Sequence, residues 1–449
     1  MATSTDRRVA IIGSGMGGLT ACLAFAKKGF RHIDVYESAL GLGFVGAGIQ
    51  IAPNLIRVLD RLGCWDGSTV EKEGTRVSEA IVLDGATNAE MMRTDMSGLC
   101  DKYGYPHYAG HRASLAGTLY EAALKEPNVR FHFGETLQDV TSFAPGRVNF
   151  VIKSRDGESR TMNADILIGA DGIKSVVRTT LLRELGLHGQ VKETGQAAYR
   201  ILLTRRELEP YPELLSFLDS NAVRRWIGEK RHVICYPIDD HRIYNISTCQ
   251  PDVNFAGTAN TTWTTKGSKK QMMDTFSDFN PLIKQMLSLV PDGEVVEWRM
   301  RSHTPLDEWT HGGVALIGDA CHPTLPHLSQ GAAMSIEDGA TVAEVVGLLF
   351  DTEGAGAGWE AVTKALKVYH LLRKDRTATI VEMAAFSGRV LHLGEGAAKV
   401  ERDRQFANTK GGKGANPDKW LDPEVQQMVY GHDCIKEVRE RFEELFSSM

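Results

Sequence analysis

The stretch RRVAIIGSGMGG, residues 7–18, decides the fold of this chain. Its apolar, β-branched first half predicts a buried strand, and its glycine-rich second half predicts a tight turn. An apolar helical stretch follows over residues 19–28, and a second strand is predicted over residues 33–36, ending at Glu37. Strand, turn, helix and strand in this order predict one βαβ unit at the start of the chain.

The glycines of this turn have the GxGxxG spacing, and their place between a strand and a helix makes the motif specific for a dinucleotide. Gly13 permits the tight turn, Gly15 lets a pyrophosphate approach the backbone, and Gly18 lets the helix pack closely on the strand. The pyrophosphate then meets the helix N-terminus. Glu37 ends the second strand, where a carboxylate can accept hydrogen bonds from an adenosine ribose. The motif alone does not distinguish NAD from FAD.

Two later apolar strands have a similar ending. DILIGADG (165–172) and VALIGDA (314–320) each finish in glycine and aspartate, an arrangement that brings backbone and carboxylate close to a polyol such as the ribityl chain of a flavin. Between them, residues 195–250 are rich in β-branched and aromatic residues and predict a separate sheet.

These elements predict an α/β fold. A Rossmann-type domain is assembled from discontinuous segments, an antiparallel β-sheet domain is inserted into it, and a helical part ends the chain. The 449 residues are enough for two packed domains with an appendage. We expect the dinucleotide domain at 1–75, 104–180 and 294–350, the inserted substrate domain at 76–103 and 181–293, and the helical part at 351–449.

Composition excludes several classes of partner. A formal net charge of -6 gives no basic footprint, which argues against nucleic acid or an anionic membrane. Seven cysteines without a CxxC pair predict a reducing compartment. No signal region and no long apolar run is found, so we expect a cytoplasmic protein without a membrane segment. The 14 histidines lack HExxH spacing, and no metal site is predicted.

Three ordered motifs carry a family resemblance: GSGMGG (13–18), IGADGIKSVVR (168–178) and LIGDACHPTLPHLSQGAAMSIEDG (316–339). Together they resemble the single-component (group A) FAD-dependent aromatic hydroxylases, in particular the fungal salicylate hydroxylase-like members. The resemblance spans about residues 7–345. It implies FAD as cofactor, NADH or NADPH as co-substrate, and an FAD domain around an antiparallel substrate domain. Where relatives often read DAAHA, this chain reads DACHP, with Cys321 expected to be a small buried residue.

The resemblance also implies which residues bind the cofactor. The segment GFVGAGIQIAPN (43–54) is similar to the flavin-lining stretch of the family, and HRASL (111–115) to the segment whose arginine contacts the flavin and its phosphate-ribityl arm. The aspartate of the DG motif is associated with both FAD and NAD(P)H, and that of the GD motif with the ribitol. The expected cofactor-binding residues are Gly13, Gly15, Gly18, Glu37, Gly48, Arg112, Asp171, Asp319, Pro326 and Gly331.

Three residues of the predicted middle sheet are the candidates for catalysis. His232 and Tyr236 in RHVICYP (231–237) resemble positions that lie near the substrate in the family, and Arg200 in QAAYRILLT (196–204) resembles an arginine that faces flavin and substrate. Residues four apart on a strand share a face, which fits either a common pocket or a satisfied core pair. An internal salt bridge would equally explain Arg200. His322 and His327 are further candidates beside the flavin, and His322 is expected to be structural.

The function implied by the resemblance is NAD(P)H- and O2-dependent hydroxylation of a small phenolic acid through a flavin C4a-hydroperoxide. We expect salicylate to be converted to catechol with loss of carbon dioxide. Decarboxylating 1-hydroxylation of 4-hydroxybenzoate to hydroquinone remains open, as does oxidation of a larger aromatic secondary metabolite. From other classes, an NAD-dependent dehydrogenase or a non-catalytic flavin-binding protein is the alternative. The pattern leaves open whether the protein is a monomer or a homodimer.

Overall fold

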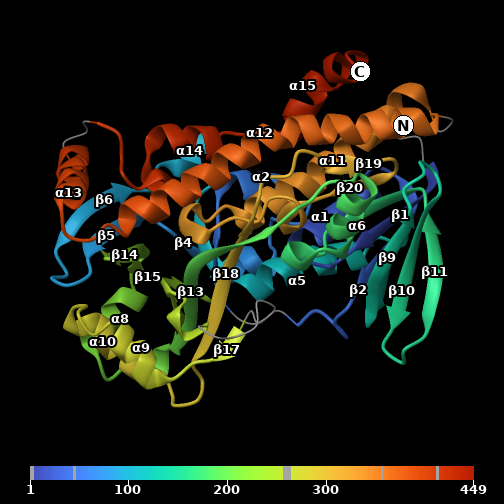
Figure 1. Cartoon of the computed structure of the whole chain (residues 1–449). Coiled ribbons are helices and arrows are strands. Elements are labelled where there is room, and N and C mark those ends of the chain that lie inside the picture. Colours follow the sequence, from blue (N-terminus) through green and yellow to red (C-terminus); the bar gives the residue numbers. More distant parts are fainter. Residues whose placement is uncertain (1–4, 44–46, 256–263, 355–356, 411–413) are drawn as a thin grey trace.

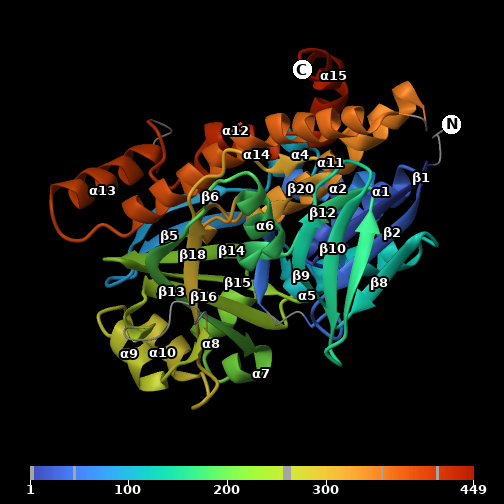
Figure 2. The same cartoon turned by 45° about the vertical axis from the view of Figure 1, so that its right-hand side comes forward.

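The computed structural model describes residues 5–43, 47–255, 264–354, 357–410 and 414–449. Two large sheets lie side by side, and a long C-terminal helix runs across both of them (Figures 1 and 2). The first sheet begins with the predicted βαβ unit, which is confirmed as β1 (Thr5–Ile12), α1 (Met16–Lys27) and β2 (Phe30–Glu37).

This first sheet has six strands, and all but one neighbouring pair are parallel. Ile11 of β1 lies opposite Val35 on one side and Ile168 on the other, and all three are buried, as expected for parallel strands covered on both faces. The strand order is β19 (Thr310–His311), β20 (Val314–Leu316), β12 (Ile166–Gly169), β1, β2 and β8 (Val129–Phe133).

Helices and a small sheet cover the faces of this sheet. Helix α1 packs against α5 (Arg112–Leu124) and against α11 (Gly331–Glu353). The predicted hairpin at residues 147–164 forms β10 (Val148–Ser154) and β11 (Ser159–Ala164), which join β9 (Glu135–Ser142) in a three-stranded sheet. Further short helices of this part are α2 (Pro53–Arg61), α3 (Thr69–Glu73), α4 (Leu99–Tyr103) and α6 (Val176–Glu184).

The second large sheet has eight strands, and every pair is antiparallel except β14 with β5. One face packs on a hydrophobic cluster that includes Trp226 and Tyr244, over the helices α7 (Arg205–Leu208), α8 (Pro212–Leu218), α9 (Lys269–Thr275) and α10 (Pro281–Ser288). The strand order is β17 (Thr264–Lys266), β18 (Val296–His303), β13 (Val191–Thr204), β16 (Ile243–Pro251), β15 (Arg231–Ile238), β14 (Ala222–Gly228), β5 (Glu79–Asp84) and β6 (Glu90–Asp95).

One of the expected domain boundaries differs from the strand pairing in the structure. We expected the dinucleotide domain to resume at residue 294, but β18 hydrogen-bonds β13 and β17 and therefore belongs to the eight-stranded sheet. The chain leaves that sheet only after His303. A small sheet of β3 (Gly48–Ile51), β7 (Tyr108–His111) and β4 (Thr75–Arg76) connects the two large ones, with β7 in contact with β15.

The C-terminal part is helical, as predicted. Helix α12 (Trp359–Leu391) runs along α11 over both sheets (Figure 1), and α13 (Ala397–Lys410), α14 (Pro423–Tyr430) and α15 (Cys434–Ser447) follow. The two ends of α12 contact different parts of the molecule. Its first turns lie near the six-stranded sheet, and the residue that follows its last turn, His392, contacts the eight-stranded sheet. In the described part of the chain, no helix is long and apolar enough to cross a membrane.

Candidate active site

A cavity of about 370 Å³ lies between the two large sheets. One wall is formed by the glycine-rich turn after β1, the strand β3 and the N-terminus of α11. The opposite wall is the face of the eight-stranded sheet that carries Arg200, His232 and Tyr236. The cavity therefore joins the predicted cofactor residues to the predicted substrate residues.

The backbone geometry of the turn agrees with the GxGxxG motif, while its contacts with a cofactor stay a prediction. Gly13 has φ of 99°, and a Cβ on it would lie 2.5 Å from the carbonyl oxygen of Ala170. A Cβ on Gly18 would lie 2.0 Å from the carbonyl oxygen of Gly13, so helix and turn pack without space for a side chain. Around Gly15, in contrast, a Cβ meets no atom of the described residues within 4 Å. The backbone at Gly15 is thus open to the cavity, as a pyrophosphate would require.

Glu37 lies beside this turn, at the end of β2. Its carboxylate accepts hydrogen bonds from the backbone N and the Oγ of Ser14, at 2.9 and 2.8 Å, and from the backbone N of Ala39. Burial tends to raise the pKa of Glu37, but these hydrogen bonds outweigh it and lower the pKa. Glu37 is therefore a fixed carboxylate, able to accept further hydrogen bonds from ribose hydroxyls.

Several positive groups face the cavity without an anionic partner. Helices α1 and α11 both direct their N-termini at it, and neither has a side-chain cap. Unpaired amides at a helix N-terminus attract negative charge. Arg112, the first residue of α5, also lines the cavity, and in the described residues it has no salt-bridge partner. These groups fit the diphosphate and the flavin of FAD.

The other predicted cofactor residues divide into two groups. Asp319, Pro326, Gly331 and Gly48 line the cavity. Asp171 does not line it: its carboxylate accepts hydrogen bonds from the backbone N of Val176 and Val177 at the start of α6. Asp171 thus fixes the conformation of the DG turn, and a direct contact with a cofactor stays a prediction.

Gly48 connects the two walls of the cavity. Its backbone N donates a hydrogen bond of 2.7 Å to Oδ1 of Asn245, and a Cβ on it would lie 2.6 Å from the ring of Tyr236. The strand β3 therefore fits against the substrate sheet only with glycine at this position.

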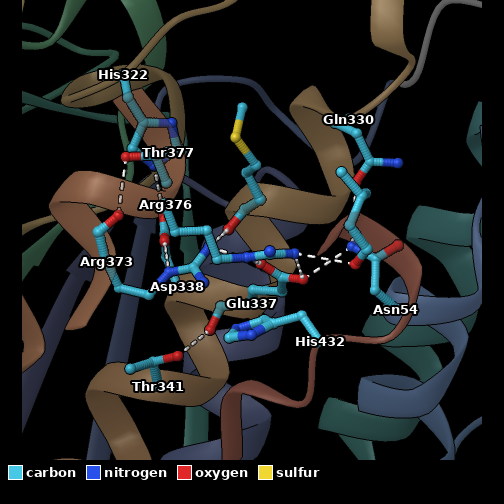
Figure 3. Close-up of polar contacts among 12 residues, drawn as sticks. Asn54, His322, Gln330, Glu337, Asp338, Thr341, Arg373, Arg376, Thr377 and His432 are labelled. Atoms are coloured by element: carbon cyan, nitrogen blue, oxygen red, sulfur yellow. Dashed lines mark hydrogen bonds and ion pairs between the residues drawn. The ribbon is translucent and has the colours of Figure 1, made fainter. Parts of the chain in front are cut away.

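A buried network of charged residues joins α11 to α12 (Figure 3). Asp338 of α11 accepts hydrogen bonds from the backbone N of Gly318 at 2.9 Å and from Nε of Arg373 at 2.7 Å, and its Oδ2 lies 2.5 Å from Nε2 of His322. Since Gly318 and His322 flank Asp319, Asp338 fixes the loop that carries Asp319.

The same network extends to the C-terminal helices. Glu337 of α11 pairs with Arg373 at 2.8 Å and with Arg376 at 3.0 Å, both on α12. It also accepts a hydrogen bond of 2.8 Å from Asn54 of α2. We call these six residues the charged network: Asn54, His322, Glu337, Asp338, Arg373 and Arg376.

Charge pairing sets the protonation states in this network. Burial disfavours the charged imidazole of His322, yet the neighbouring Cys321 and Asp338 together raise the pKa of His322 well above its ordinary value. Burial likewise works against the Asp338 carboxylate, while His322 and Arg373 lower the pKa of Asp338. His322 and Asp338 therefore form an ion pair, and the expectation that His322 is structural fits this geometry.

The substrate wall carries an arginine without an acidic partner. Arg200 of β13 lies with its guanidinium 5.0 Å from the ring centroid of Trp298, and no described residue forms a salt bridge with it. Desolvation, followed by the like charge of Arg112, lowers the pKa of Arg200. Among the described residues, no internal salt bridge explains Arg200, and this residue is exposed at the cavity wall, where a bound anion could pair with it.

Tyr236 and His232 lie on the same face of β15, with Ile234 between them on the cavity wall. Burial raises the pKa of the Tyr236 hydroxyl, so Tyr236 remains a hydrogen-bond donor. Among the described residues its hydroxyl has no hydrogen-bond partner. These residues form a shared pocket with Arg200, rather than a satisfied core pair.

Two further histidines lie next to His232. His232 Nδ1 is 2.7 Å from Nε2 of His392, and the ring of His327 lies 5.5 Å from that of His232 and 5.6 Å from that of His392. His327 and His392 come from the 3-10 turn η4 (Pro326–Leu328) and from the C-terminal end of α12. We call His232, His327 and His392 the histidine cluster.

Two groups of potential metal ligands, which sequence spacing did not predict, lie at the histidine cluster and the charged network. The first group is His232, Cys249 and His392, and the second is Cys321, His322 and Asp338. In the first, burial raises the pKa of the Cys249 thiol to about 12, so it carries no charge, and the cation Arg225 lies nearby. In the second, His322 and Asp338 already form an ion pair. Neither arrangement favours a metal ion, because ligands must be deprotonated to bind one.

Sequence reasoning missed His392, Arg225, Asp338 and Arg178. Arg178 joins two cofactor loops, because it donates hydrogen bonds to the carbonyl oxygens of Ala320 and Ile173. It stands inside the IGADGIKSVVR motif, where a buried arginine after a DG turn was the available signal. His392 had no such signal, since its contact with His232 depends on the path of α12.

Comparisons with known proteins agree with this site. A family model described as an FAD-binding domain matches residues 6–384. The chain is 30% identical over 405 residues to the FAD-dependent monooxygenase ntnJ of Nectria sp, which covers 89% of this chain and 88% of that protein. It is also 30% identical over 397 residues to 3-hydroxybenzoate 6-hydroxylase of Klebsiella oxytoca, covering 88% of this chain and 90% of that enzyme.

Solved structures share the fold. The CtdE structure in complex with FAD and a substrate superimposes with a TM-score of 0.79, at 21% identity, over 98% of this chain and 99% of that one. A salicylate hydroxylase substrate complex superimposes with a TM-score of 0.76, at 22% identity, over 97% and 98% of the two chains. The fold class predicted from the sequence is thereby confirmed.

Proposed function

The chain belongs to the FAD-binding domain family, and from this premise we propose that it uses NAD(P)H and O2 to hydroxylate a small phenolic acid. Its relatives are FAD-dependent monooxygenases and aromatic hydroxylases, so it is an FAD-dependent monooxygenase rather than a dehydrogenase or a non-catalytic flavin-binding protein. The substrate is the part that we propose.

One observation supports a phenolic acid above other aromatic compounds. Arg200 is a cation on the substrate wall that has no acidic partner among the described residues, and it shares that wall with His232 and Tyr236. A guanidinium binds a carboxylate through two parallel hydrogen bonds. The same charge would also stabilise a phenolate, which is the electron-rich form that reacts.

The cofactor would be held by residues of the opposite wall. Gly15 and the N-terminus of α1 would meet the diphosphate, Glu37 the adenosine ribose, and Arg112 and Asp319 the flavin side. FAD supplies the oxidising chemistry, while the protein orients the phenol and excludes water. His232 and Tyr236 are placed to accept and donate hydrogen bonds at the substrate hydroxyl.

Among the isomers, 3-hydroxybenzoate is the first to test. The sequence predicts salicylate, but the salicylate hydroxylase match is a structural one at 22% identity and carries the fold alone. Relatives named 3-hydroxybenzoate 6-hydroxylase are 30% identical over most of the chain. Carbon 6 of that substrate is para to the hydroxyl, where a phenolate is nucleophilic. Salicylate would instead react at its carboxylate-bearing carbon and lose carbon dioxide.

The test is NADH and NADPH oxidation by the FAD-loaded protein with 3-hydroxybenzoate, salicylate and 4-hydroxybenzoate. We expect at least one isomer to stimulate oxidation and to yield a diphenol. Arg200→Met should raise the Kd of that isomer roughly 10- to 100-fold, because it removes a charge-assisted pair. Arg224→Met is the matched control, since Arg224 contacts Phe217 and Ser220 on the other face of the sheet. Stimulation by none of the three acids would refute the proposal.

A further inference from the structure

One hydrogen bond in the histidine cluster connects the cavity to the end of α12. The ring of His232 is part of the cavity wall, and its Nδ1 lies 2.7 Å from Nε2 of His392. Within the described chain, Nε2 of His232 has no hydrogen-bond partner. The tautomer with hydrogen on Nδ1 of His232 therefore leaves Nε2 as a free acceptor at the cavity wall.

His392 contacts His232 but does not line the cavity. It is the residue that follows the last turn of α12, its carbonyl oxygen accepts a hydrogen bond from the backbone N of Lys230, and 8% of the residue is exposed. His232 is more deeply placed, with 4% exposed. The pair thus connects the cavity wall to a histidine outside the cavity lining, and that histidine keeps slightly more exposed surface than His232.

The surroundings keep both rings neutral. Burial, followed by Arg225 of β14 and Arg402 of α13, lowers the pKa of His392 to about 4. Burial and the neighbouring His392, His327 and Arg225 hold the pKa of His232 well below its ordinary value. Cys249 of β16 completes the surroundings as a neutral thiol. A proton that enters this pair is therefore not retained, and neutral imidazoles are available to receive the next one.

We propose that His392 is a positioning residue that accepts, through His232, the proton of the substrate hydroxyl and passes it to solvent. The inference rests on the proposed function, because it requires a phenol in the cavity. The phenol O–H bond breaks as an N–H bond forms at Nε2 of His232. The Nδ1–H bond of His232 breaks as an N–H bond forms at Nε2 of His392. His392 then releases its Nδ1 proton to water, and the phenolate stays beside Arg200.

Proton release is the direct test. The FAD-loaded protein is mixed with 3-hydroxybenzoate without NAD(P)H, in weak buffer with a pH indicator, while the flavin absorbance reports binding and the phenolate absorbance reports ionisation. We expect His392→Gln to bind the acid with a Kd within about twofold of wild type. The amide accepts the hydrogen bond from His232 but no proton, so release should slow roughly a hundredfold.

His370→Asn is the matched control. His370 is also on α12, burial also lowers its pKa to about 4, and its Nδ1 accepts a hydrogen bond from the backbone N of Trp309 rather than from His232. We expect His370→Asn to release the proton at the wild-type rate. An unchanged rate in His392→Gln, or an equal slowing in both variants, would overturn the inference.

A measurement without substrate separates this inference from the proposed function. If no hydroxybenzoate perturbs the flavin absorbance, the proposed function fails, and ¹⁵N spectra of histidine-labelled protein then decide on the pair. We expect His392 to stay neutral down to a pH of about 4, with hydrogen on Nδ1 of His232. A His392 that is charged at neutral pH, or no shared hydrogen bond, would overturn the inference in either case.

Discussion

The charged network and the histidine cluster are both buried and both link α12 to the cavity, but they differ in charge. In the charged network each carboxylate meets a cation: Glu337 pairs with Arg373 and Arg376, and Asp338 with Arg373 and His322. In the histidine cluster, the described residues leave both ring nitrogens of His327 without a partner, and the rings are neutral. The charged network fixes the loop that carries Asp319, whereas the histidine cluster leaves imidazole nitrogens free to accept a proton.

The difference follows from whether the buried groups of each cluster are charged or neutral. A buried ion pair is costly to break, because removal of one partner leaves the other charged and unsolvated. A neutral imidazole pair is less costly to alter, and its hydrogen can move between two similar nitrogens. We therefore expect changes in the charged network to act on stability and cofactor binding, and changes in the histidine cluster to act on proton transfer and on the pH dependence of stability.

The largest effect is expected for Arg373→Met. The change leaves Glu337 and Asp338 buried with fewer cations, so the unfolding free energy should fall by about 3–5 kcal/mol, and FAD should bind more weakly because the loop of Asp319 loses support. Urea unfolding and FAD titration measure this. Arg404→Ala, which breaks an exposed pair with Glu401, should leave the unfolding free energy nearly unchanged. Equal losses of stability in the two variants would show that burial of the charged network does not make its ion pairs costly to break.

A smaller effect, with a defined pH dependence, is expected for His322→Asn. Because the folded pKa of His322 is raised above its unfolded value, the ion pair stabilises the fold fully below pH 6.5 and less as pH rises through the folded pKa. The variant should be less stable by roughly 2 kcal/mol at pH 6, a gap that narrows on the alkaline side. Urea unfolding between pH 6 and 10 tests this, and a gap that is constant over that range would refute the ion pair.

The opposite pH dependence is expected for His392→Gln. Here the folded pKa of about 4 lies below the ordinary 6.5, so the unfolded chain binds more protons between these values and stability falls as pH is lowered through this window. Between pH 6.5 and 4, the unfolding free energy of the variant should fall by roughly 2 kcal/mol less than that of the wild type. His188→Gln, at an exposed histidine, is the control and should follow wild type. An identical acid profile in all three proteins would show that His392 is not buried as a neutral ring.

The smallest effect on stability is expected for Gly15→Ala, which touches neither cluster. In the part of the chain that the structure describes, a Cβ there meets no atom within 4 Å, and φ is -67°, so the unfolding free energy of the apoprotein should change by less than about 1 kcal/mol. FAD affinity should fall at least tenfold, because the methyl group would occupy the approach of the pyrophosphate. Unchanged FAD affinity in fluorescence titration would place the diphosphate elsewhere.

The cofactor wall could be predicted from the sequence because its signals are local. The turn at residues 13–18 and the end of β2 at Glu37 are fixed by a short stretch of chain, and the structure places them as expected. Asp171 shows the limit of motif reasoning, since the carboxylate of a DG turn can bind either a cofactor or the backbone of a following helix, and here it accepts a hydrogen bond from the backbone N of Val176 in the first turn of α6.

The substrate wall is different because it is assembled over long sequence distances. Strand alternation placed His232 and Tyr236 on one face, and the structure brings Arg200 to the same wall. No periodicity could place His392, 160 residues along the chain, against His232, because that contact depends on the length and direction of α12. The boundary at residue 294 was misplaced for the same reason, since the pairing of β18 with β13 is also long-range.

The most direct test of the central claim is hydroxylation under oxygen-18 gas. FAD-loaded protein, NAD(P)H and 3-hydroxybenzoate, with salicylate in a parallel reaction, would be analysed by mass spectrometry for the aromatic product. We predict a diphenol that carries one atom of oxygen-18 for each NAD(P)H consumed. Consumption of NAD(P)H without label in any aromatic product would contradict the assignment of these phenolic acids as substrates.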